Sequence, residues 1–583
     1  GNVTQITPIE ILLNVILQKY FSSFRCLTIF SETPLQLNYS SQFMYFSPNE
    51  HLVPQIMEAS ESGCSDYVIH MSDPSRFMEA FETVTHKGNV RRSDRKLIFL
   101  PFKTLNNSEN DLLAVLTMKE ITFVPNVLLI LPTKIESYEA FDLVTHVYEG
   151  DNNKSRDPLI IDHWDIHQQR FLKDVNLFPH DLTNLQGKIV KVAAFTYTPY
   201  VILGVEDRPC GSDGTEIRII EEFCRWVNCT MEIVTDDDEW GEIFENLTGI
   251  GVLGNVVEDR ADFAITALYS WYEEYVELDF SASCVRTSIT CLAPAPRLLV
   301  SWQTPLLPFS ADMWLALGLT FIFASFSLMV VQGFSTRNIF MTTFGMMITQ
   351  SQAHSGSSWR VRSVTGWMLL TGLIIDNAYG GGLATVFTVP KYEPSIDTIK
   401  DIVERKVEWG ATQNAWVFSL TLSQDELIKS LVSQFRTYPP KELQSRSLTR
   451  SMAYSIEKLP AGYFAIGDYI TEEAIRDMSI MLEDFYYEYS VIMMRKSSPF
   501  TEKISTLVGR LHQSGLVLAW ERQVALKYLN YNIQLEVKLS RSKRDVENVR
   551  PLQLSQVMVC IYGSSKVPLP LPIFQVYKGS LIS

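Results

Sequence analysis

Asp376 is a charged side chain inside an apolar stretch, and three consecutive glycines, Gly380–Gly382, follow it before Pro390 in the sequence AYGGGLATVFTVP. Each glycine inside a helix costs about 1 kcal/mol relative to alanine, so a glycine run in a helical stretch needs a reason. A carboxylate inside a membrane segment is costly and usually faces water or a partner. Two interpretations of Asp376 therefore stay open: it lines an aqueous path for cations, or it is satisfied at a polar interface.

The other residues with possible chemistry are weaker candidates. His163 and His167, in HWDIH, are four residues apart, which would place them on one helical face as zinc ligands are placed. No HExxH motif or third ligand accompanies them, so we favour a surface loop or helix and predict no metal and no cofactor. Because no nucleophile–base pair or phosphate-binding loop is present either, we do not expect an enzyme.

Composition excludes some classes of protein. The chain has 583 residues, enough for several domains, and a formal net charge of −16, which argues against nucleic-acid binding. Hydrophobic residues make up 46%, a level that a few membrane segments set in soluble domains would produce.

Compartment is indicated by N-glycosylation sequons and cysteines. All six sequons precede the first long hydrophobic segment, which favours an extracellular N-terminal half. They begin at Asn2, Asn38, Asn106, Asn153, Asn228 and Asn246. There are eight cysteines and no C-x-x-C pair, and some should form disulfides outside the cell. Which of Cys210, Cys224 and Cys229 would pair stays open.

The soluble parts of the chain read as α/β. Residues 1–182 alternate helical and strand-like patterns, with a buried strand in NVLLILP, Asn126 to Pro132. Residues 183–308 show strand, amphipathic helix and strand in succession, which predicts a parallel sheet. Residues 390–530 return to the same character, so one soluble region is split by what lies between.

The intervening residues 309–389 predict a membrane pore domain. Residues 313–336 and 364–389 are long enough to span a bilayer, whereas residues 339–350 are apolar but too short. Arg337, Arg360 and Arg362 flank the short run on both sides, so the positive-inside rule places both of its ends in the cytoplasm. A segment that enters and leaves on one face, between two spans, is a pore-loop layout.

This arrangement resembles the ionotropic glutamate receptors, and more narrowly the arthropod ionotropic receptors, over roughly residues 185–530. The resemblance implies a bilobed, periplasmic-binding-protein-like ligand-binding domain split by a helical pore domain. It implies that Thr349 and Gln350 occupy the pore tip. It also implies a gate where helices of several subunits converge, made by Tyr379, Gly380, Gly381, Gly382, Leu383 and Ala384.

The same resemblance implies where a ligand would sit. Without gaps, the position of the family's carboxylate-binding arginine falls on Glu274, and the neighbouring contacts fall on Ala267 and Tyr269. In the second lobe the contacts fall near Trp416, and the acidic residue that meets a ligand's amino group falls on Asp468. A site so acidic and aromatic should repel glutamate and favour a cation or an apolar odorant. Arg286 is a weaker candidate for a replacement cation.

The resemblance thus predicts a sensory receptor subunit of the plasma membrane, a non-selective cation channel gated by a ligand or another stimulus and not by glutamate. It implies assembly with a co-receptor as a hetero-tetramer. Residues 531–583 lack the expected last span, so the alternative is a truncated, non-conducting regulatory or binding subunit. Temperature, humidity or a partner subunit could move the lobes in place of a ligand. A solute-binding protein of a transporter is disfavoured by the pore loop.

Overall fold

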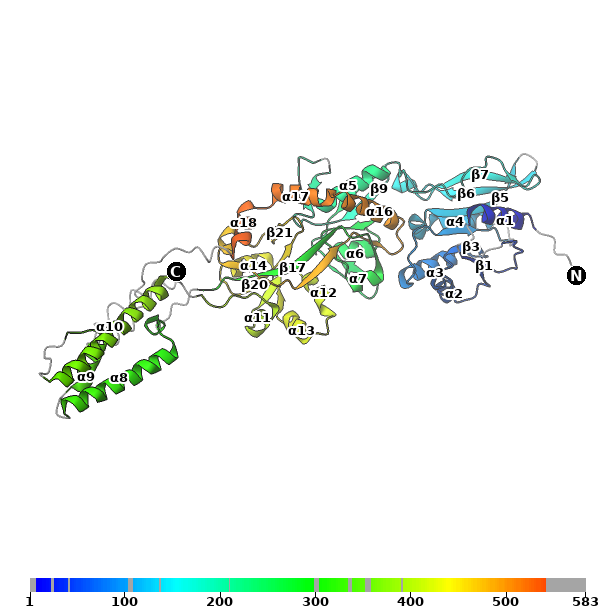
Figure 1. The fold of residues 1–583 in the computed structure, drawn as a ribbon. Coiled ribbons are helices and arrows are strands. Elements are labelled where there is room, and N and C mark those ends of the chain that lie inside the picture. The colour runs from blue at the N-terminus through cyan, green and yellow to red at the C-terminus, as the bar shows by residue number, and fades with distance from the viewer. Residues whose placement is uncertain are drawn as a thin grey trace. The chain divides into compact units, whose positions relative to one another are not determined.

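The computed structural model describes residues 7–541 except for short segments at 22–25, 40–41, 103–107, 136–137, 209, 298–303, 334–337, 352–357 and 389–391. The chain forms two compact units (Figure 1). The first comprises Gly1–Pro294 and Asp397–Lys538, and the second comprises Ala295–Ile396 and Leu539–Ser583. The predictions for Asn2, Asn106 and most of the tail 531–583 lie outside the described residues.

The first unit begins with an eight-stranded sheet in the order β2-β1-β3-β4-β5-β6-β7-β8, which with its helices we call the N-terminal domain. Strands β2 to β5 along this order are parallel and the rest antiparallel. The strands are β1 (Leu27–Ser31), β2 (Phe43–Phe46), β3 (Asp66–His70), β4 (Lys96–Phe99), β5 (Asn126–Ile135), β6 (Tyr138–His146), β7 (Pro158–Asp165) and β8 (Arg170–Phe171). The helices are α1 (Pro8–Tyr20), α2 (Leu52–Glu61), α3 (Pro74–Lys87) and α4 (Ser108–Thr117).

Both faces of this sheet are covered, which explains why its strands are apolar throughout. Successive side chains of a strand point to opposite faces. Val68 and Ile98 therefore join the core beneath α1, while Ile69 and Phe99 join the core beneath α2, α3 and α4. Parallel strands buried on both faces read as continuous apolar runs, as β3 and β4 do.

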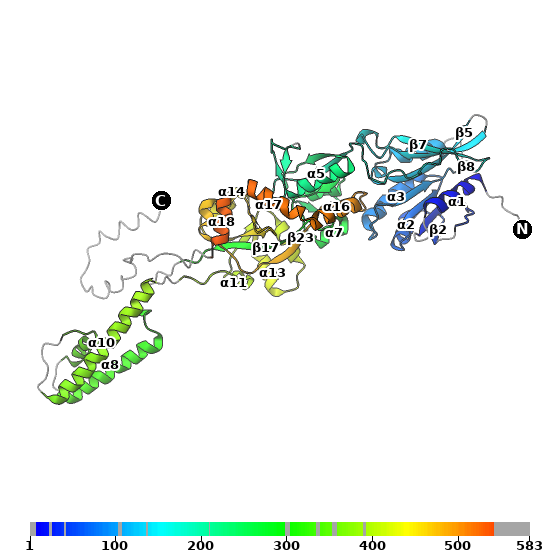
Figure 2. The ribbon, with the colours of Figure 1, turned by 45° about the horizontal axis from the view of Figure 1, so that its top comes forward.

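A second sheet, in the order β12-β9-β15-β24-β16, forms the centre of what we call lobe 1. Strands β9, β12 and β15 are parallel, as the strand–helix–strand pattern predicts. Ile217, Ile220 and Phe223 form the buried stripe of helix α5. The strands are β9 (Ile189–Ala193), β12 (Thr230–Val234), β15 (Phe263–Ala264), β16 (Leu278–Phe280) and β24 (Met493–Arg495). The helices are α5 (Thr215–Val227), α6 (Gly251–Val257), α7 (Tyr272–Glu277), α16 (Thr501–Gln513) and α17 (Leu516–Tyr528), with α16 and α17 beside α5 (Figure 2).

A third sheet, in the order β19-β18-β20-β17-β22 with β21 and β23 beside it, forms lobe 2. Its core includes Leu292, Tyr454 and Ile456. The strands are β17 (Val285–Pro294), β18 (Trp409–Ala411), β19 (Phe435–Thr437), β20 (Ala453–Lys458), β21 (Phe464–Ala465), β22 (Met478–Ile480) and β23 (Tyr486–Ser490). The helices are α11 (Ile399–Glu404), α12 (Phe418–Thr421), α13 (Glu426–Ser433), α14 (Pro440–Ser447), α15 (Glu472–Ile475) and α18 (Tyr531–Leu539).

The chain crosses between the lobes twice, and the two crossings lie side by side. One runs from β16 to β17 and the other from β23 to β24. The Ser281 amide donates to the Ile492 carbonyl at 2.9 Å, and the Cys284 amide donates to the Ser490 carbonyl at 2.8 Å. Two adjacent, hydrogen-bonded crossings form a hinge, because a rotation of one lobe has to bend both.

The second unit contains helices α8 (Ala311–Gln332), α9 (Ile339–Met347) and α10 (Trp359–Thr388). Within the part of the chain that the structure describes, α8 is the one helix long and apolar enough to cross a membrane. Its large side chains are exposed, with Phe323 at 73%, as a lipid-facing helix requires. Helix α10 has 30 residues but carries Arg360, Arg362 and Asp376, so a multi-pass topology stays a prediction.

Helix α9 packs on both longer helices, and a glycine sets its distance from α10. A Cβ atom added at Gly372 would lie 2.3 Å from the Met346 carbonyl oxygen. Real Cβ atoms do not approach an oxygen so closely, so only glycine permits this packing. A Cβ added at Gly366 of the same helix would meet no atom within 4 Å.

Two predictions about cysteines and histidines are resolved by the fold. Disulfides join Cys26 to Cys64 and Cys224 to Cys229, while Cys210 is free, which settles the pairing left open within that group. His163 lies in strand β7 and His167 in the following turn, so the expectation of a loop or helix for both is wrong for His163. The described residues contain no group of three metal-binding side chains. The sequon asparagines at 38, 153, 228 and 246 are exposed.

We predict that Gly372→Ala destabilises the second unit by about 1–3 kcal/mol, because the added methyl group forces α9 away from α10. Gly366→Ala is the matched control and should be neutral or stabilising by about 1 kcal/mol, since it changes helix propensity alone. Thermal unfolding of the two variants in detergent measures the difference. Equal melting temperatures for both would show that the close packing at Gly372 is unimportant.

Candidate functional site

Mostly aromatic side chains from both lobes line a small cavity between them. Its volume is about 10 Å³. A water molecule needs roughly 10–15 Å³, so the cavity holds one water at most. Its lining residues are Tyr197, Trp240, Ala267, Tyr269, Trp271, Ala415 and Trp416, and none of them is lysine or arginine.

Rings from lobe 1 meet rings from lobe 2 directly. The ring centre of Trp416, in the turn after β18, lies 6.3 Å from that of Trp240 and 6.5 Å from that of Tyr197, and both pairs are edge-to-face. Trp271 meets Phe418 of α12 at 5.2 Å. Edge-to-face pairs at these distances are favourable, so the lobes are held closed by their own side chains.

A buried carboxylate lies behind this aromatic wall. Glu457, in the central strand β20 of lobe 2, is fully buried. It accepts hydrogen bonds from the Tyr200 hydroxyl at 2.5 Å and from the Tyr197 hydroxyl at 3.3 Å, both in lobe 1. A second hydrogen bond between the lobes joins the Thr412 hydroxyl to the Glu239 carboxylate at 3.2 Å.

Burial dominates the electrostatics of the closed site. It raises the pKa of Glu457, while the hydroxyl groups of Tyr200, Tyr269, Thr287 and Tyr197, in decreasing order of effect, oppose that shift. Burial and then the charge of Glu457 raise the pKa of Tyr200 well above its usual value. Burial also raises the pKa of Glu239. Closing the lobes thus removes Glu457 and Glu239 from water, and neither forms an ion pair within the part of the chain that the structure describes, so protonation favours the closed form.

Another buried carboxylate shapes the lobe 1 side of the site. Glu216, at the start of α5, accepts hydrogen bonds from the Thr266 amide at 2.6 Å and the Ala267 amide at 3.0 Å. Its other oxygen accepts from the Ser490 hydroxyl at 2.7 Å. Thr266 and Ala267 have φ values of 101° and 50°, a region that costs non-glycine residues energy. Glu216 therefore holds a strained turn and ties it to the hinge.

The structure brings together three of the residues at which a ligand was predicted. Ala267, Tyr269 and Trp416 line the small cavity. Glu274 is buried on α7 outside that lining, where burial raises its pKa to about 7. Asp468 is exposed and does not line the cavity.

Sequence reasoning missed the carboxylate that does lie between the lobes. Glu457 stands in AYSIEK, a strand in which it follows four buried, uncharged residues and precedes the half-buried Lys458. A lone glutamate in such a strand was a usable signal, because a charge is rarely buried without a partner. Tyr200 and Trp240 were also missed, since their contacts with lobe 2 join residues far apart in sequence.

The second unit places the predicted pore residues near one another. Helix α9 ends before Thr349, which has a φ of 56° and turns the chain. The Thr349 hydroxyl donates to the Asp376 carboxylate of α10 at 3.3 Å, and the Gln350 amide donates to the Gly345 carbonyl at 2.7 Å. All three predicted residues, Thr349, Gln350 and Asp376, are exposed in the single chain.

Helix α10 continues unbroken through the predicted gate. The Tyr379 hydroxyl donates to the Pro305 carbonyl at 2.9 Å. A Cβ added at Gly380 or Gly381 would meet no atom within 4 Å, whereas one at Gly382 would lie 3.1 Å from Pro308. Leu383 and Ala384 follow in the same helix. Two of the three glycines thus leave one side of α10 open for the close approach of another helix.

No model of a known protein family matches this chain. It is 22% identical over 376 residues to Ionotropic receptor 21a of Anopheles gambiae, covering 60% of this chain and 37% of that protein. It is 23% identical over 258 residues to the delta-1 ionotropic glutamate receptor of Homo sapiens, covering 40% of this chain and 26% of the receptor. It is 21% identical over 363 residues to the delta-2 ionotropic glutamate receptor of Mus musculus, covering 57% of this chain and 36% of that receptor.

These homologues are members of the ionotropic glutamate receptor family, including an insect ionotropic receptor, so the predicted resemblance is confirmed. The chain spans 26% to 37% of the length of these three relatives.

We predict that Tyr200→Phe lowers the closed-to-open equilibrium constant of the lobes about tenfold or more, because Glu457 loses its shortest hydrogen bond while buried. Tyr197→Phe is the matched control and should cost less, since its bond is longer. Fluorescence energy transfer between dyes on the two lobes measures closure. An effect of Tyr197→Phe equal to that of Tyr200→Phe would contradict the assignment of Tyr200 as the main partner.

Proposed function

Starting from the homology with ionotropic receptors, we propose that this chain is a receptor subunit, not an enzyme, and part of a stimulus-gated, non-selective cation channel. The observation that carries the channel proposal is the contact between Thr349 and Asp376. It joins the end of the short helix α9 to the middle of the long helix α10. A carboxylate held beside the turn of a re-entrant segment suits a cation path, because rings of acidic side chains attract cations.

We propose that the sensing step is movement of lobe 2 relative to lobe 1, and that glutamate does not drive it. A carboxylate ligand needs a guanidinium or a similar group. The cavity lining contains no lysine or arginine that could pair with a carboxylate ligand. The aromatic wall and Glu457 instead suit a small cation or an apolar molecule, which must displace the aromatic rings to enter. A stimulus without a ligand, such as temperature or humidity, would act on the same closure.

Assembly and location follow from the same proposal. The subunit would assemble with a co-receptor as a hetero-tetramer in the plasma membrane, with the N-terminal half outside the cell. The two disulfides of the N-terminal half support an oxidising compartment. The exposed asparagines of four sequons support a glycoprotein. In such an assembly, the open side of α10 at Gly380 and Gly381 would face a neighbouring subunit.

We expect Asp376→Asn to reduce the single-channel cation conductance roughly twofold or more when the full protein is expressed with a co-receptor, because the cation path loses its fixed charge. Asp312→Asn makes the same change in the first turn of α8 and should leave the conductance unchanged. Patch-clamp recording of both variants, with surface expression measured in parallel, makes the comparison.

Equal conductance in the two variants would contradict the role of Asp376. Co-receptor currents that never depend on this chain, although it reaches the surface, would favour the alternative of a non-conducting regulatory subunit.

A further inference from the structure

One of the predicted glycosylation sequons lies in a hairpin turn of lobe 1 that the proposed channel does not use. The hairpin joins β13 (Glu242–Ile243) to β14 (Gly249–Ile250), which pair antiparallel. The turn between them, residues 244–248, has the sequence FENLT. Alternate side chains of this turn are exposed to solvent together: Phe244, Asn246 and Thr248.

Two backbone hydrogen bonds and one positive φ define the turn. The Leu247 amide donates to the Phe244 carbonyl at 3.0 Å, and the Phe244 amide donates to the Thr248 carbonyl at 2.8 Å. Leu247 has a φ of 59°. A β-turn followed by a residue in the left-handed region is a common hairpin loop, and glycine usually takes that place because other residues adopt the conformation at a cost. Contacts on the surface of the turn must offset that cost.

The side chain of Asn246 already has a fixed direction. Its Oδ1 atom accepts from the Thr248 hydroxyl at 2.6 Å and from the Thr248 amide at 3.3 Å. Asparagine commonly closes such a local ring with the backbone two residues on. Because the amide oxygen is held, the direction of the Nδ2 atom is fixed as well, and this is the atom that carries the sugar of an N-linked glycan.

Phe244 offers an exposed aromatic ring beside this asparagine. Its side chain is 45% exposed. A single exposed apolar residue needs no explanation by itself. Here, however, the ring stands two residues before a glycan acceptor, on the exposed side of the same turn. The face of an aromatic ring is electron-rich, so it suits the C–H groups on one face of a pyranose sugar.

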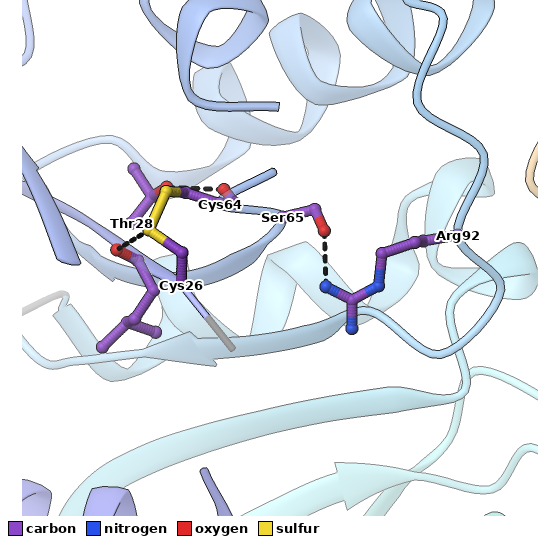
Figure 3. The surroundings of a disulfide bond; sticks show 6 residues. Cys26, Thr28, Cys64, Ser65 and Arg92 are labelled. Carbon is purple, nitrogen blue, oxygen red and sulfur yellow. Dashed lines mark hydrogen bonds between the residues drawn. A yellow bond between two sulfur atoms is a disulfide. The ribbon is translucent and has the colours of Figure 1, made fainter. Parts of the chain in front are cut away.

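Two other exposed sequons lie in segments that disulfides already fix. Asn228 directly precedes Cys229, which is bonded to Cys224, and the Asn228 amide donates to the Asn184 side chain at 2.8 Å. Asn38 lies in the loop that the Cys26–Cys64 disulfide closes (Figure 3). The β13–β14 hairpin contains no cysteine, so its turn depends on hydrogen bonds and on what covers Phe244.

The hairpin also supports a residue of the cavity between the lobes. Trp240, which lines that cavity, stands two residues before β13. Its carbonyl accepts from the Leu253 amide at 3.1 Å, and the Gly249 amide donates to the Glu258 carboxylate at 3.0 Å. A stiff turn therefore helps to hold the segment that carries Trp240.

We propose that Phe244 is the docking platform for the first N-acetylglucosamine of a glycan on Asn246, and that this contact stiffens the β13–β14 turn. The proposal rests on the extracellular location proposed above. A sugar linked two residues away has an effective concentration in the millimolar range or above, so weak stacking suffices to keep it on the ring.

Attachment of the sugar leaves the turn intact. The Nδ2 atom of Asn246 bonds to C1 of the sugar, the bond from C1 to the diphosphate of a lipid-linked donor breaks, and the displaced proton goes to water. The amide keeps one N–H group and its oxygen, so the hydrogen bonds from Thr248 persist.

The experiment uses the full chain made in secretory cells, with each N-glycan trimmed to one N-acetylglucosamine. Asn246→Gln removes the sugar, and Phe244→Leu removes the ring but keeps an apolar side chain. Hydrogen–deuterium exchange is followed in residues 243–250. We expect Asn246→Gln to raise exchange about threefold or more beyond its effect in the Phe244→Leu background. Loss of the hydrogen bonds with Thr248 is common to both backgrounds, so the difference reports the sugar on the ring.

Asn153→Gln is the matched control, because Asp151 takes the place of the aromatic residue two positions before Asn153. Exchange in residues 151–157 should change by less than about twofold in this variant. Mass spectrometry of the glycopeptides gives the occupancy of each sequon.

An equal effect of Asn246→Gln in the two backgrounds, with Asn246 occupied, would overturn the proposal. An Asn246 that stays bare while other sequons carry sugar would also overturn it, but would leave the extracellular location intact. A chain whose sequons are all bare would contradict that location as well.

Discussion

The structure depends on a carboxylate that is buried between two lobes and that forms no ion pair with any cation among the described residues. Glu457 reaches from the central strand of lobe 2 to Tyr200 of lobe 1, and aromatic rings from both lobes exclude water around it. An ionised carboxylate is expensive to bury, and neutral hydroxyl donors repay only part of that cost. Closure therefore rests on a balance between aromatic packing, which favours it, and the desolvation of Glu457, which opposes it. Such a balance can be shifted by a modest stimulus.

A second buried carboxylate, Glu216, positions the lobe 1 side of the site between the lobes. Glu216 holds the strained turn at Thr266 and Ala267 and, through Ser490, ties that turn to the hinge. Lobe 2 is attached to lobe 1 through this hinge. Glu216 therefore links Ala267, which lines the cavity, to Ser490 at the hinge. In the second unit, Gly372 sets the spacing of α9 and α10 and so brings Thr349 to Asp376.

Features with a local cause could be predicted from the sequence. The apolar run at 313–336 predicts α8, which the structure places at Ala311–Gln332. The shorter apolar run at 339–350 contains α9, Ile339–Met347. The buried stripe of α5 follows from helical periodicity alone. Glu457 could not be placed in this way, because its environment is created by strands and loops far apart in the sequence. The acidic residue chosen by resemblance, Asp468, is exposed instead. The contact of Arg495 with Glu82 is likewise invisible until the N-terminal domain and lobe 1 have folded together.

The central claim is that direct contacts between side chains of the two lobes are sufficient to hold the lobes closed. It is tested most directly by the distance between spin labels on the two lobes of the full, ligand-free protein. Exposed positions suitable for labelling are Glu245 of lobe 1 and Lys441 of lobe 2, with the free Cys210 replaced by serine. The account predicts one narrow, short distance distribution without any added molecule. A long or broad distribution that shortens only when a small molecule is added would contradict it.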